Sequence, residues 1–168
     1  MTAGSGPAAA DVAAVRAQLG REPRGMLAVA HRCACELPDV VETAPRLADG
    51  TPFPTLYYLT CPRATSAVST LEASGVMRVM QGRLAADDEL AAAYRRAHEA
   101  YLERRAVHGV VPEIEGVSAG GMPARVKCLH VLVAHSLAAG PGVNPLGDEA
   151  LAALAPWGAG GPCVAVPA

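Results

Sequence analysis

The segment from Pro123 to Ala138 constrains the fold more than any other part of the chain. Drawn as a helix, it carries apolar side chains on every side: Val126, Leu129, Val131, Leu132, Val133, Ala134 and Leu137. A helix that is apolar around its whole circumference is usually buried. We therefore predict a helix over residues 123–138, ended by Gly140, at the centre of the protein.

The same segment also carries ionisable side chains: Arg125, Lys127, Cys128, His130 and His135. Buried charges are costly unless they are paired, so these groups need partners, a ligand or access to solvent. On an ideal helix, Cys128 and His135 share a face but lie about 10 Å apart along the axis, and His130 points to the opposite side. We therefore expect at most one of the three to join any given metal ion. The simpler interpretation is a small core cysteine and histidines that bond to backbone carbonyls.

The rest of the chain favours an α+β fold. Residues 26–32, 40–44 and 55–60 are rich in β-branched and aromatic residues or lie between turn signals, which predicts a small antiparallel sheet of about three strands, a meander with helices on one face. The remaining periodic segments predict helices over 11–19, with Asp11 as N-cap, and over 62–74, 76–84, 87–105 and 145–154. This sheet in the N-terminal half would pack against a mainly helical C-terminal half with one buried central helix.

Length and composition indicate one domain. The 168 residues are 51% hydrophobic and 18% charged, which is a globular balance. We assign 1–10 to a disordered N-terminus, 11–157 to a single globular domain and 158–168 to a flexible tail rich in Gly and Pro.

Charge and hydropathy exclude several classes of protein. A net charge of −2 argues against general nucleic-acid binding. The sequence contains no run of about 18 apolar residues, so it predicts no membrane span, and the N-terminus does not resemble a signal peptide. We expect a cytoplasmic protein whose five cysteines are reduced and form no disulfide framework.

The thiols suggest a metal site. In a three-stranded meander the first and third strands end at the same edge, so Cys33, Cys35 and Cys61 lie there, and Cys128 from the central helix could complete a set of four. Sets of thiolates and imidazoles suit zinc, and four thiolates can hold an iron–sulfur cluster, although no CxxC pair is present. The alternatives are free thiols, or a cysteine nucleophile with a histidine as base, either His31 beside Cys33 or a remote histidine beside Cys128.

Two further groups of residues are candidates for function. Gly120 and Gly121 precede the predicted central helix, and together with Arg125 and Lys127 they could bind a phosphate or a carboxylate. The plain alternative is a tight turn. Asn144 and Asp148, in the run NPLGDE, either take part in a site beside the central helix or only cap the last helix.

Four runs together resemble a known family. They are VETAPRLADGTPFPTLYYLT from Val41, STLEASG from Ser69, GGMPARVKCLH from Gly120 and GVNPLGD from Gly142. The chain is similar here to the actinobacterial domain-of-unknown-function family numbered 501, over most of residues 20–155. The resemblance implies no activity, and its usual gene neighbours, which include a septum-formation initiator and an exopolyphosphatase, are only an association. It implies that Arg32-Cys33, Lys127 to His130, Ala134-His135 and the Asn-Pro-x-Gly-Asp turn belong to the family pattern, and that Cys35 and Cys163 do not. The resemblance therefore favours a mixed metal site of Cys33, Cys61 and Cys128 with His130 or His135 over a cluster of four thiolates.

The sequence thus leaves three hypotheses open, without deciding whether the protein is an enzyme. The first is zinc or iron binding by Cys33, Cys61 and Cys128 with His130 or His135. The second is an enzyme or sensor for a small phosphorylated or carboxylated compound. The third is a non-catalytic adaptor in cell-envelope or division processes, docking through the charged helix around 95–105. Under each hypothesis, the sequence does not identify the partners of the protein.

Overall fold

A computed structural model describes residues 6–167, so the first half of the predicted disordered N-terminus lies outside the described residues, as does Ala168. The helices and strands follow the predicted order. They are α1 (Ala9–Leu19), β1 (Met26–Arg32), β2 (Pro38–Thr43), β3 (Tyr57–Leu59), α2 (Pro62–Ala73), α3 (Val76–Ala86), α4 (Asp88–Ala106), the short 3-10 helix η1 (Pro112–Ile114), α5 (Leu129–Ala139) and α6 (Pro145–Ala152).

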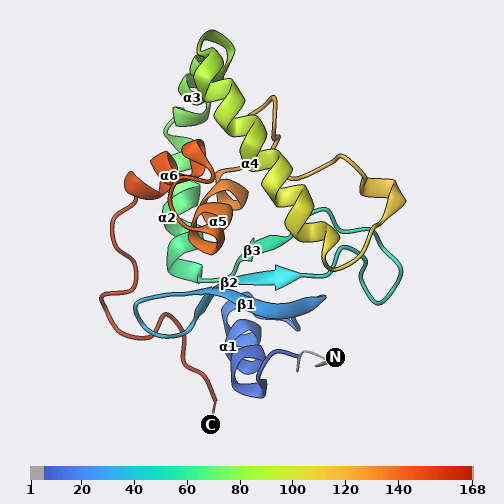
Figure 1. Cartoon of the computed structure of the whole chain (residues 1–168). Helices are drawn as coiled ribbons and strands as arrows, with labels where there is room; N and C mark the ends of the chain where they lie inside the picture. The colour runs from blue at the N-terminus through green and yellow to red at the C-terminus, as the bar shows by residue number, and fades with distance from the viewer. Residues whose placement is uncertain (1–5, 168) are drawn as a thin grey trace.

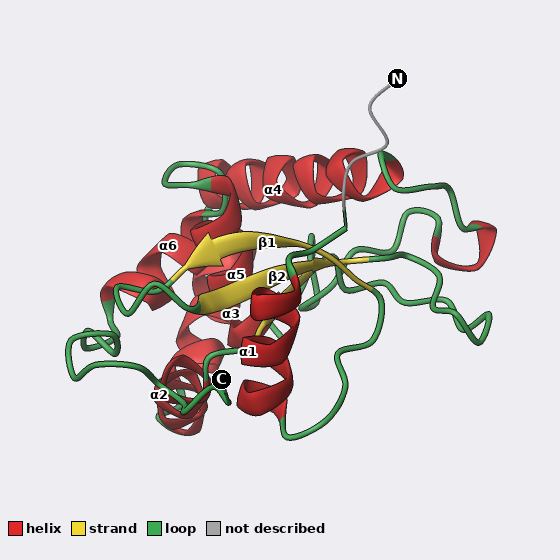
Figure 2. Ribbon diagram, turned by 90° about the horizontal axis from the view of Figure 1, so that it is seen from below, coloured by secondary structure: helices red, strands yellow, loops and turns green. Residues whose placement is uncertain are grey.

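The three strands form an antiparallel meander with β2 in the middle. Helix α5 crosses one face of this sheet, and α2, α4 and α6 surround α5 (Figure 1). Helix α1 lies against the opposite face, which Figure 2 shows from below. The prediction of an α+β fold with a buried central helix is therefore confirmed, whereas the expectation that all helices pack on one face is wrong. Because β2 is covered on both sides, all six of its residues are buried, including Asp39 and Glu42.

The helix termini explain most of the boundaries. Pro62 occupies the first turn of α2, where a proline costs no backbone hydrogen bond, and the Asp87 side chain accepts a hydrogen bond from the Leu90 N–H to cap α4. Asp11 does not cap α1, because that helix begins at Ala9. Its carboxylate instead forms a two-point ion pair with Arg32 at the end of β1.

The central helix begins later than predicted. Residues 123–128 are not helical, and α5 starts at Leu129. The chain turns sharply at Gly120 and Gly121, which have φ values of 68° and 93°. The backbone N–H groups of Lys127 and Val126 then donate to the Gly120 carbonyl and to the Gln81 side chain. Because these two N–H groups bond to the turn and to α3, they cannot form the hydrogen bonds of an α-helix, and α5 begins only at Leu129.

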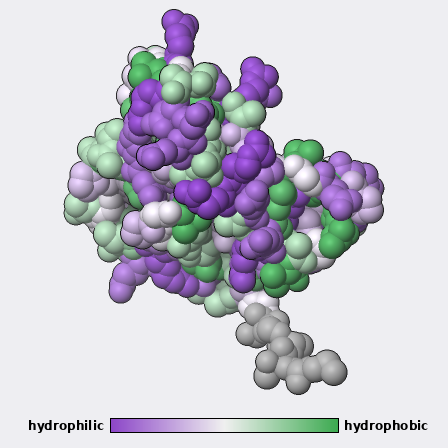
Figure 3. Space-filling view, turned by 45° about the horizontal axis from the view of Figure 1, so that its top comes forward, coloured by the Kyte–Doolittle hydropathy of each residue, from purple (hydrophilic) through white to green (hydrophobic). Residues whose placement is uncertain are grey.

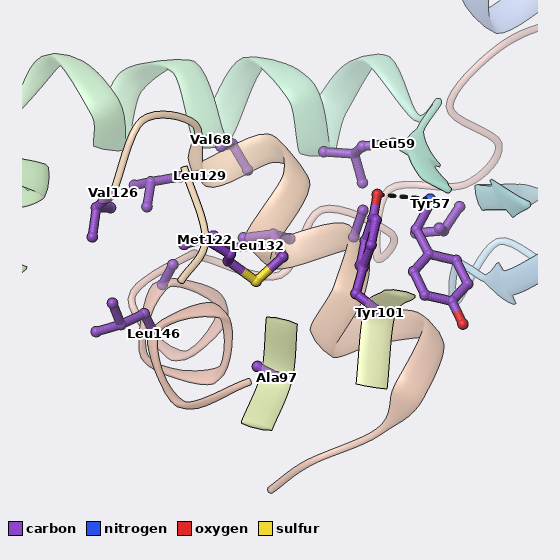
Figure 4. Packing of buried hydrophobic residues seen from close by; sticks show 14 of the residues in the cluster. Tyr57, Leu59, Val68, Ala97, Tyr101, Met122, Val126, Leu129, Leu132 and Leu146 are labelled. Carbon is purple, nitrogen blue, oxygen red and sulfur yellow. Dashed lines mark hydrogen bonds between the residues drawn. The ribbon is translucent and has the colours of Figure 1, made fainter. Parts of the chain in front are cut away.

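The hydrophobic core lies between α5, the sheet and α4, and part of it is shown in Figure 4. Tyr101 of α4 is fully buried, and its hydroxyl accepts hydrogen bonds from the N–H of Leu56 at 2.6 Å and of Tyr57 at 3.4 Å. The ring also meets His135 of α5 edge-on, with 5.1 Å between the ring centroids. Tyr101 therefore joins α4, α5 and the start of β3.

We predict that Tyr101→Phe lowers the free energy of unfolding by about 1–3 kcal/mol, because it leaves a buried backbone N–H without an acceptor. Tyr58→Phe, at a partly exposed tyrosine of β3, is the matched control and should change stability little. Denaturant unfolding of both variants measures the difference. Equal stabilities would show that the Tyr101 hydroxyl does not hold the edge of β3.

Candidate metal centre

Three side chains that could bind a metal meet where the end of α2 contacts the start of α5. Glu72 lies in the last turn of α2, Cys128 is the N-cap of α5, and His130 is in the first turn of α5. One ligand atom from each lies within 4.8 Å of the others. Among the residues that the structure describes, this is the one group of three or more such side chains that meets this distance criterion.

The Glu72 carboxylate connects the two helices. Its Oε1 atom accepts a hydrogen bond from the Leu129 N–H at 2.8 Å and lies 3.0 Å from His130 Nδ1. The first bond satisfies a backbone donor that would otherwise lack a partner at the start of α5. The carboxylate of one helix therefore caps the next and also faces its histidine.

The contacts of His130 define its protonation. Its Nε2 atom lies 3.2 Å from the carbonyl oxygen of Thr65 and 3.2 Å from the Ser69 hydroxyl, which itself donates to the same carbonyl. A carbonyl can only accept, so Nε2 carries a proton. The lone pair of a neutral His130 ring therefore lies on Nδ1, the atom that faces Glu72 and Cys128.

The Cys128 sulfur lies 4.0 Å from His130 Nδ1. The helical-wheel expectation that His130 points away from Cys128 is wrong, because Cys128 precedes the helix and has an extended backbone, with φ −151° and ψ 109°. The Val131 N–H and the His130 ring favour the thiolate and lower the pKa of Cys128, although burial opposes this effect. The histidine ring therefore makes the thiolate form of Cys128 easier to reach than burial alone would allow.

The neighbours of His130 raise its pKa to about 9, chiefly through the contact with Cys128 and then through the negative charge of Glu72. The imidazolium satisfies the geometry on both sides, since Nδ1 and Nε2 each face an acceptor. Each acceptor therefore stabilises the protonated ring.

A cavity of about 300 Å³ adjoins Cys128 and His130. Hydroxyl, aromatic and aliphatic side chains of β3 and its neighbours form the rest of its wall, which consists of Thr55, Tyr57, Tyr58, Leu59, Thr65 and Val131. A small molecule in this cavity could reach the sulfur and the imidazole.

The other predicted ligands lie elsewhere. Cys33 and Cys61 follow β1 and β3 at one sheet edge, as the meander predicted, and are not in the group with Cys128. His135 is almost fully buried one heptad along α5, stacks on Tyr57, and accepts a hydrogen bond from Asn144 Nδ2 at 3.2 Å. Burial lowers the pKa of His135 to about 4, so this ring is neutral.

Asn144 and Asp148 have clear structural contacts. The Asn144 side chain accepts from the Gly147 N–H and so caps α6, while its amide group orients His135. Asp148 accepts from the Gly142 N–H in the turn before α6. Any role of these residues in binding stays a prediction.

The glycine turn is explained by packing alone. A Cβ atom at Gly121 would lie 2.7 Å from the Arg125 carbonyl oxygen, so the backbone passes too close for a side chain. The side chains of Arg125 and Lys127 are exposed. The anion site that we predicted for Gly120, Gly121, Arg125 and Lys127 stays a prediction.

The charged surface of α4 divides into two kinds of residue. Arg95, Arg96, Glu99 and Glu103 are exposed, and the end of the molecule where α3 and α4 lie is mostly hydrophilic (Figure 3). Arg104 instead pairs with the buried Glu42, and the buried Arg105 donates to the carbonyls of Pro54 and Ile114. Docking through this helix would therefore use Arg95, Arg96, Glu99 and Glu103 rather than Arg104 and Arg105.

Sequence reasoning missed Glu72 as a site residue. No local spacing links it to Cys128 and His130, which follow it by more than fifty positions. The signal that was present is the run STLEASG, which contains both Ser69 and Glu72 and formed part of the family resemblance. The histidine beside the Cys128 sulfur is His130. His31, the base predicted for a Cys33 nucleophile, instead contacts the buried Asp39 at 2.7 Å.

We predict that the His130 ring titrates near pH 9 in the metal-free protein, and that Cys128→Ser and Glu72→Gln each lower this pKa. Because the folded-state pKa lies above the ordinary histidine value of 6.5, His130 stabilises the fold fully below pH 6.5, and this contribution disappears as the pH rises through about 9. NMR titration of the ring protons measures the pKa. A ring that titrates near 6.5 in all three proteins would show that these side chains are not in contact.

Comparison with known proteins adds one finding. A family described as "Protein of unknown function (DUF501)" matches residues 29–152, which includes all three side chains of the centre. No curated protein and no solved structure matches the chain. Within residues 6–167, none of the helices is both long enough and apolar enough to cross a bilayer. Since the match covers well over half of its length, the chain belongs to the DUF501 family.

Proposed function

We propose that this protein binds a transition metal ion, zinc or iron, through Glu72, Cys128 and His130. The observation that carries the proposal is the convergence of a carboxylate oxygen, a thiol sulfur and the free nitrogen of an oriented imidazole within 4.8 Å. Compared with the set expected from the sequence, Cys128 and His130 are retained and Glu72 takes the place of Cys33 and Cys61.

The distances suit a metal of this size. Zinc bonds of about 2.3 Å to sulfur and about 2.0–2.2 Å to nitrogen or oxygen place tetrahedral donors roughly 3.3–3.6 Å apart. The separation of 4.0 Å between Cys128 Sγ and His130 Nδ1, and of 3.0 Å between Nδ1 and Glu72 Oε1, bracket this range. Small rotations of the side chains would bring all three to bonding distance.

The residues around the ligands support the same proposal. Metal-binding histidines usually donate their second ring N–H to a carbonyl or carboxylate, and Thr65 provides such a carbonyl here. The Leu129 N–H holds the Glu72 carboxylate in the same way. Thiolate and imidazole ligands favour zinc or iron over magnesium or calcium, which prefer oxygen alone.

Three protein ligands leave room for a fourth. Structural zinc sites usually have four protein ligands, whereas catalytic sites have three and an open position. The cavity beside Cys128 and His130 would give a water molecule or a small substrate access to that position. A metal there would supply Lewis acidity and an activated water. The hydroxyl and aromatic groups of Thr55, Thr65 and Tyr57 would contact the bound molecule.

We predict that Co²⁺, used as a spectroscopic substitute for zinc, binds the purified protein one to one and produces a thiolate-to-metal charge-transfer band. Cys128→Ser should abolish the band. His130→Ala and Glu72→Gln should weaken binding by at least about 100-fold, because each removes one ligand of three. Affinity should rise with pH until about pH 9, since His130 must lose a proton to bind.

Cys163→Ser is the matched control, because Cys163 is a partly exposed cysteine outside the centre. This variant should bind cobalt like the wild type. Cys33→Ser tests whether the wider set contributes, and we expect no change. Cobalt binding without the charge-transfer band, or with the band unchanged in Cys128→Ser, would contradict the proposed ligands.

A second candidate function is supported by the position of Cys128. Its thiol lies at the N-terminus of a helix, accepts from the Val131 N–H and has a histidine beside it, which is how nucleophilic cysteines are activated. In this version the protein is an enzyme that acts on a small phosphorylated or carboxylated compound, with no metal. The same atoms cannot do both at once, because a metal would occupy the sulfur and the ring nitrogen.

Alkylation by iodoacetamide separates the two candidates. We expect Cys128 to react faster at pH 7 than a peptide cysteine does, since its pKa is lowered, and one equivalent of Zn²⁺ to protect it. Peptide mapping of the alkylated residue measures the rate at Cys128 alone. Rapid reaction that Zn²⁺ leaves unchanged would favour the nucleophile over the metal site.

A further inference from the structure

The four cysteines outside the metal centre gather where the C-terminal segment passes the sheet edge. Cys33 and Cys35 belong to the turn between β1 and β2, Cys61 precedes α2, and Cys163 lies in the segment after α6. In Figure 1 that segment descends from α6 past the β1–β2 turn to the side of the sheet that α1 covers, and Figure 2 also places the C-terminus near α1.

Side chains from two helices hold the C-terminal segment in place. Arg63 of α2 donates to the carbonyl oxygens of Gly161 at 2.8 Å and Pro162 at 3.1 Å. Gln18 of α1 donates to the Cys163 sulfur at 3.3 Å. Gly158 packs so closely on the turn that a Cβ there would lie 2.7 Å from the Cys33 sulfur. The segment therefore has a defined position although it forms no helix or strand.

Cys163 is the centre of the thiol cluster. Gln18 Nε2 lies 3.3 Å from the Cys163 sulfur and 2.6 Å from the Pro38 carbonyl oxygen at the end of the β1–β2 turn, so Cys163 is held against that turn. Its N–H and thiol influence the pKa of Cys35, and its thiol influences that of Cys61. Cys61 is fully buried, whereas Cys35 and Cys163 are partly exposed. Of the two thiols that Cys163 influences, only Cys35 can therefore be reached by a small oxidant from solution.

We propose that Cys35 and Cys163 are a modification site, at which hydrogen peroxide forms an intrachain disulfide that ties the C-terminal segment to the β1–β2 turn. All thiols are free in the structure, which is the reduced form. The site is separate from the proposed metal centre, because neither cysteine belongs to that group.

The order of the two steps follows from the environment of each sulfur. Hydrogen bonds from the Leu37 and Cys163 N–H groups and from the neighbouring thiols lower the pKa of Cys35, against the opposing effect of burial. Burial raises the pKa of Cys61 to about 12, which keeps it a thiol. Cys35 is thus the nucleophile and Cys163 the resolving residue.

The chemistry balances with peroxide as the oxidant. The Cys35 thiolate attacks one peroxide oxygen, the O–O bond breaks and hydroxide leaves, which gives a sulfenic acid on Cys35. The Cys163 sulfur then attacks the Cys35 sulfur, the S–O bond breaks, and the oxygen leaves as water with the Cys163 proton. The two sulfurs lose two electrons in total, and the peroxide gains them.

The test is peptide mapping of the full-length protein after treatment with hydrogen peroxide, alkylation of the remaining thiols and trypsin digestion without reductant. Cleavage at Arg and Lys separates the cysteines into three peptides: residues 33–46 with Cys33 and Cys35, residues 47–63 with Cys61, and residues 128–168 with Cys128 and Cys163. We expect a peroxide-dependent link between 33–46 and 128–168 that reductant removes. On a non-reducing gel, the oxidised protein should run in the monomer band, because the link lies within one chain.

Single variants identify the two sulfurs. The link should disappear in Cys35→Ser and Cys163→Ser and persist in Cys33→Ser and Cys128→Ser, which change the other cysteine of each peptide. All four proteins are first checked for native circular dichroism, and the wild-type map stands even where a variant fails to fold. The proposal is overturned if peroxide leaves all thiols alkylatable, if the link involves Cys61, Cys33 or Cys128, or if it joins two copies of the chain.

Discussion

The Glu72 carboxylate is the contact on which the position of the central helix and the geometry of the site both depend. It accepts the first N–H of α5 and faces the ring of His130, so a single side chain of α2 caps the start of α5 and contacts its histidine. Charged acceptors form stronger hydrogen bonds than neutral ones, and this one is partly shielded from water. Helix α5, which is apolar on all sides, therefore begins at a polar and partly exposed site of the protein.

That corner separates two groups of ionisable residues that the sequence places on one helix. The turn at Gly120 and Gly121 and the contact with Gln81 keep residues 123–128 out of the helix, so the exposed Arg125 and Lys127 precede it. His135, deep in α5, is neutral and held by Asn144 and two tyrosine rings. Of the ionisable residues in this segment, Cys128 and His130 line the cavity, are partly buried and contact each other.

The strands, their order and most helices could be predicted because their signals are local. Proline opens α2, Asp87 caps α4, Asn144 caps α6, and aromatic and β-branched residues mark the segment that contains β3. The start of α5 could not, because its capping group comes from α2 and is 57 residues away along the chain. For the same reason the sequence indicates Cys128 and His130 as candidate ligands, but an ideal helical wheel places them on opposite sides and no local spacing links them to Glu72. Contacts between thiols of the β1–β2 turn and the C-terminal segment are equally invisible in a linear pattern.

The most direct test of the centre is a crystal structure of the protein with zinc, with diffraction data collected on both sides of the zinc absorption edge. An anomalous peak bonded to Glu72, Cys128 and His130, at about 2.0–2.3 Å from each ligand atom, is the result that this account predicts. Anomalous density at Cys33, Cys61 or surface histidines, with no peak between α2 and the start of α5, would contradict it.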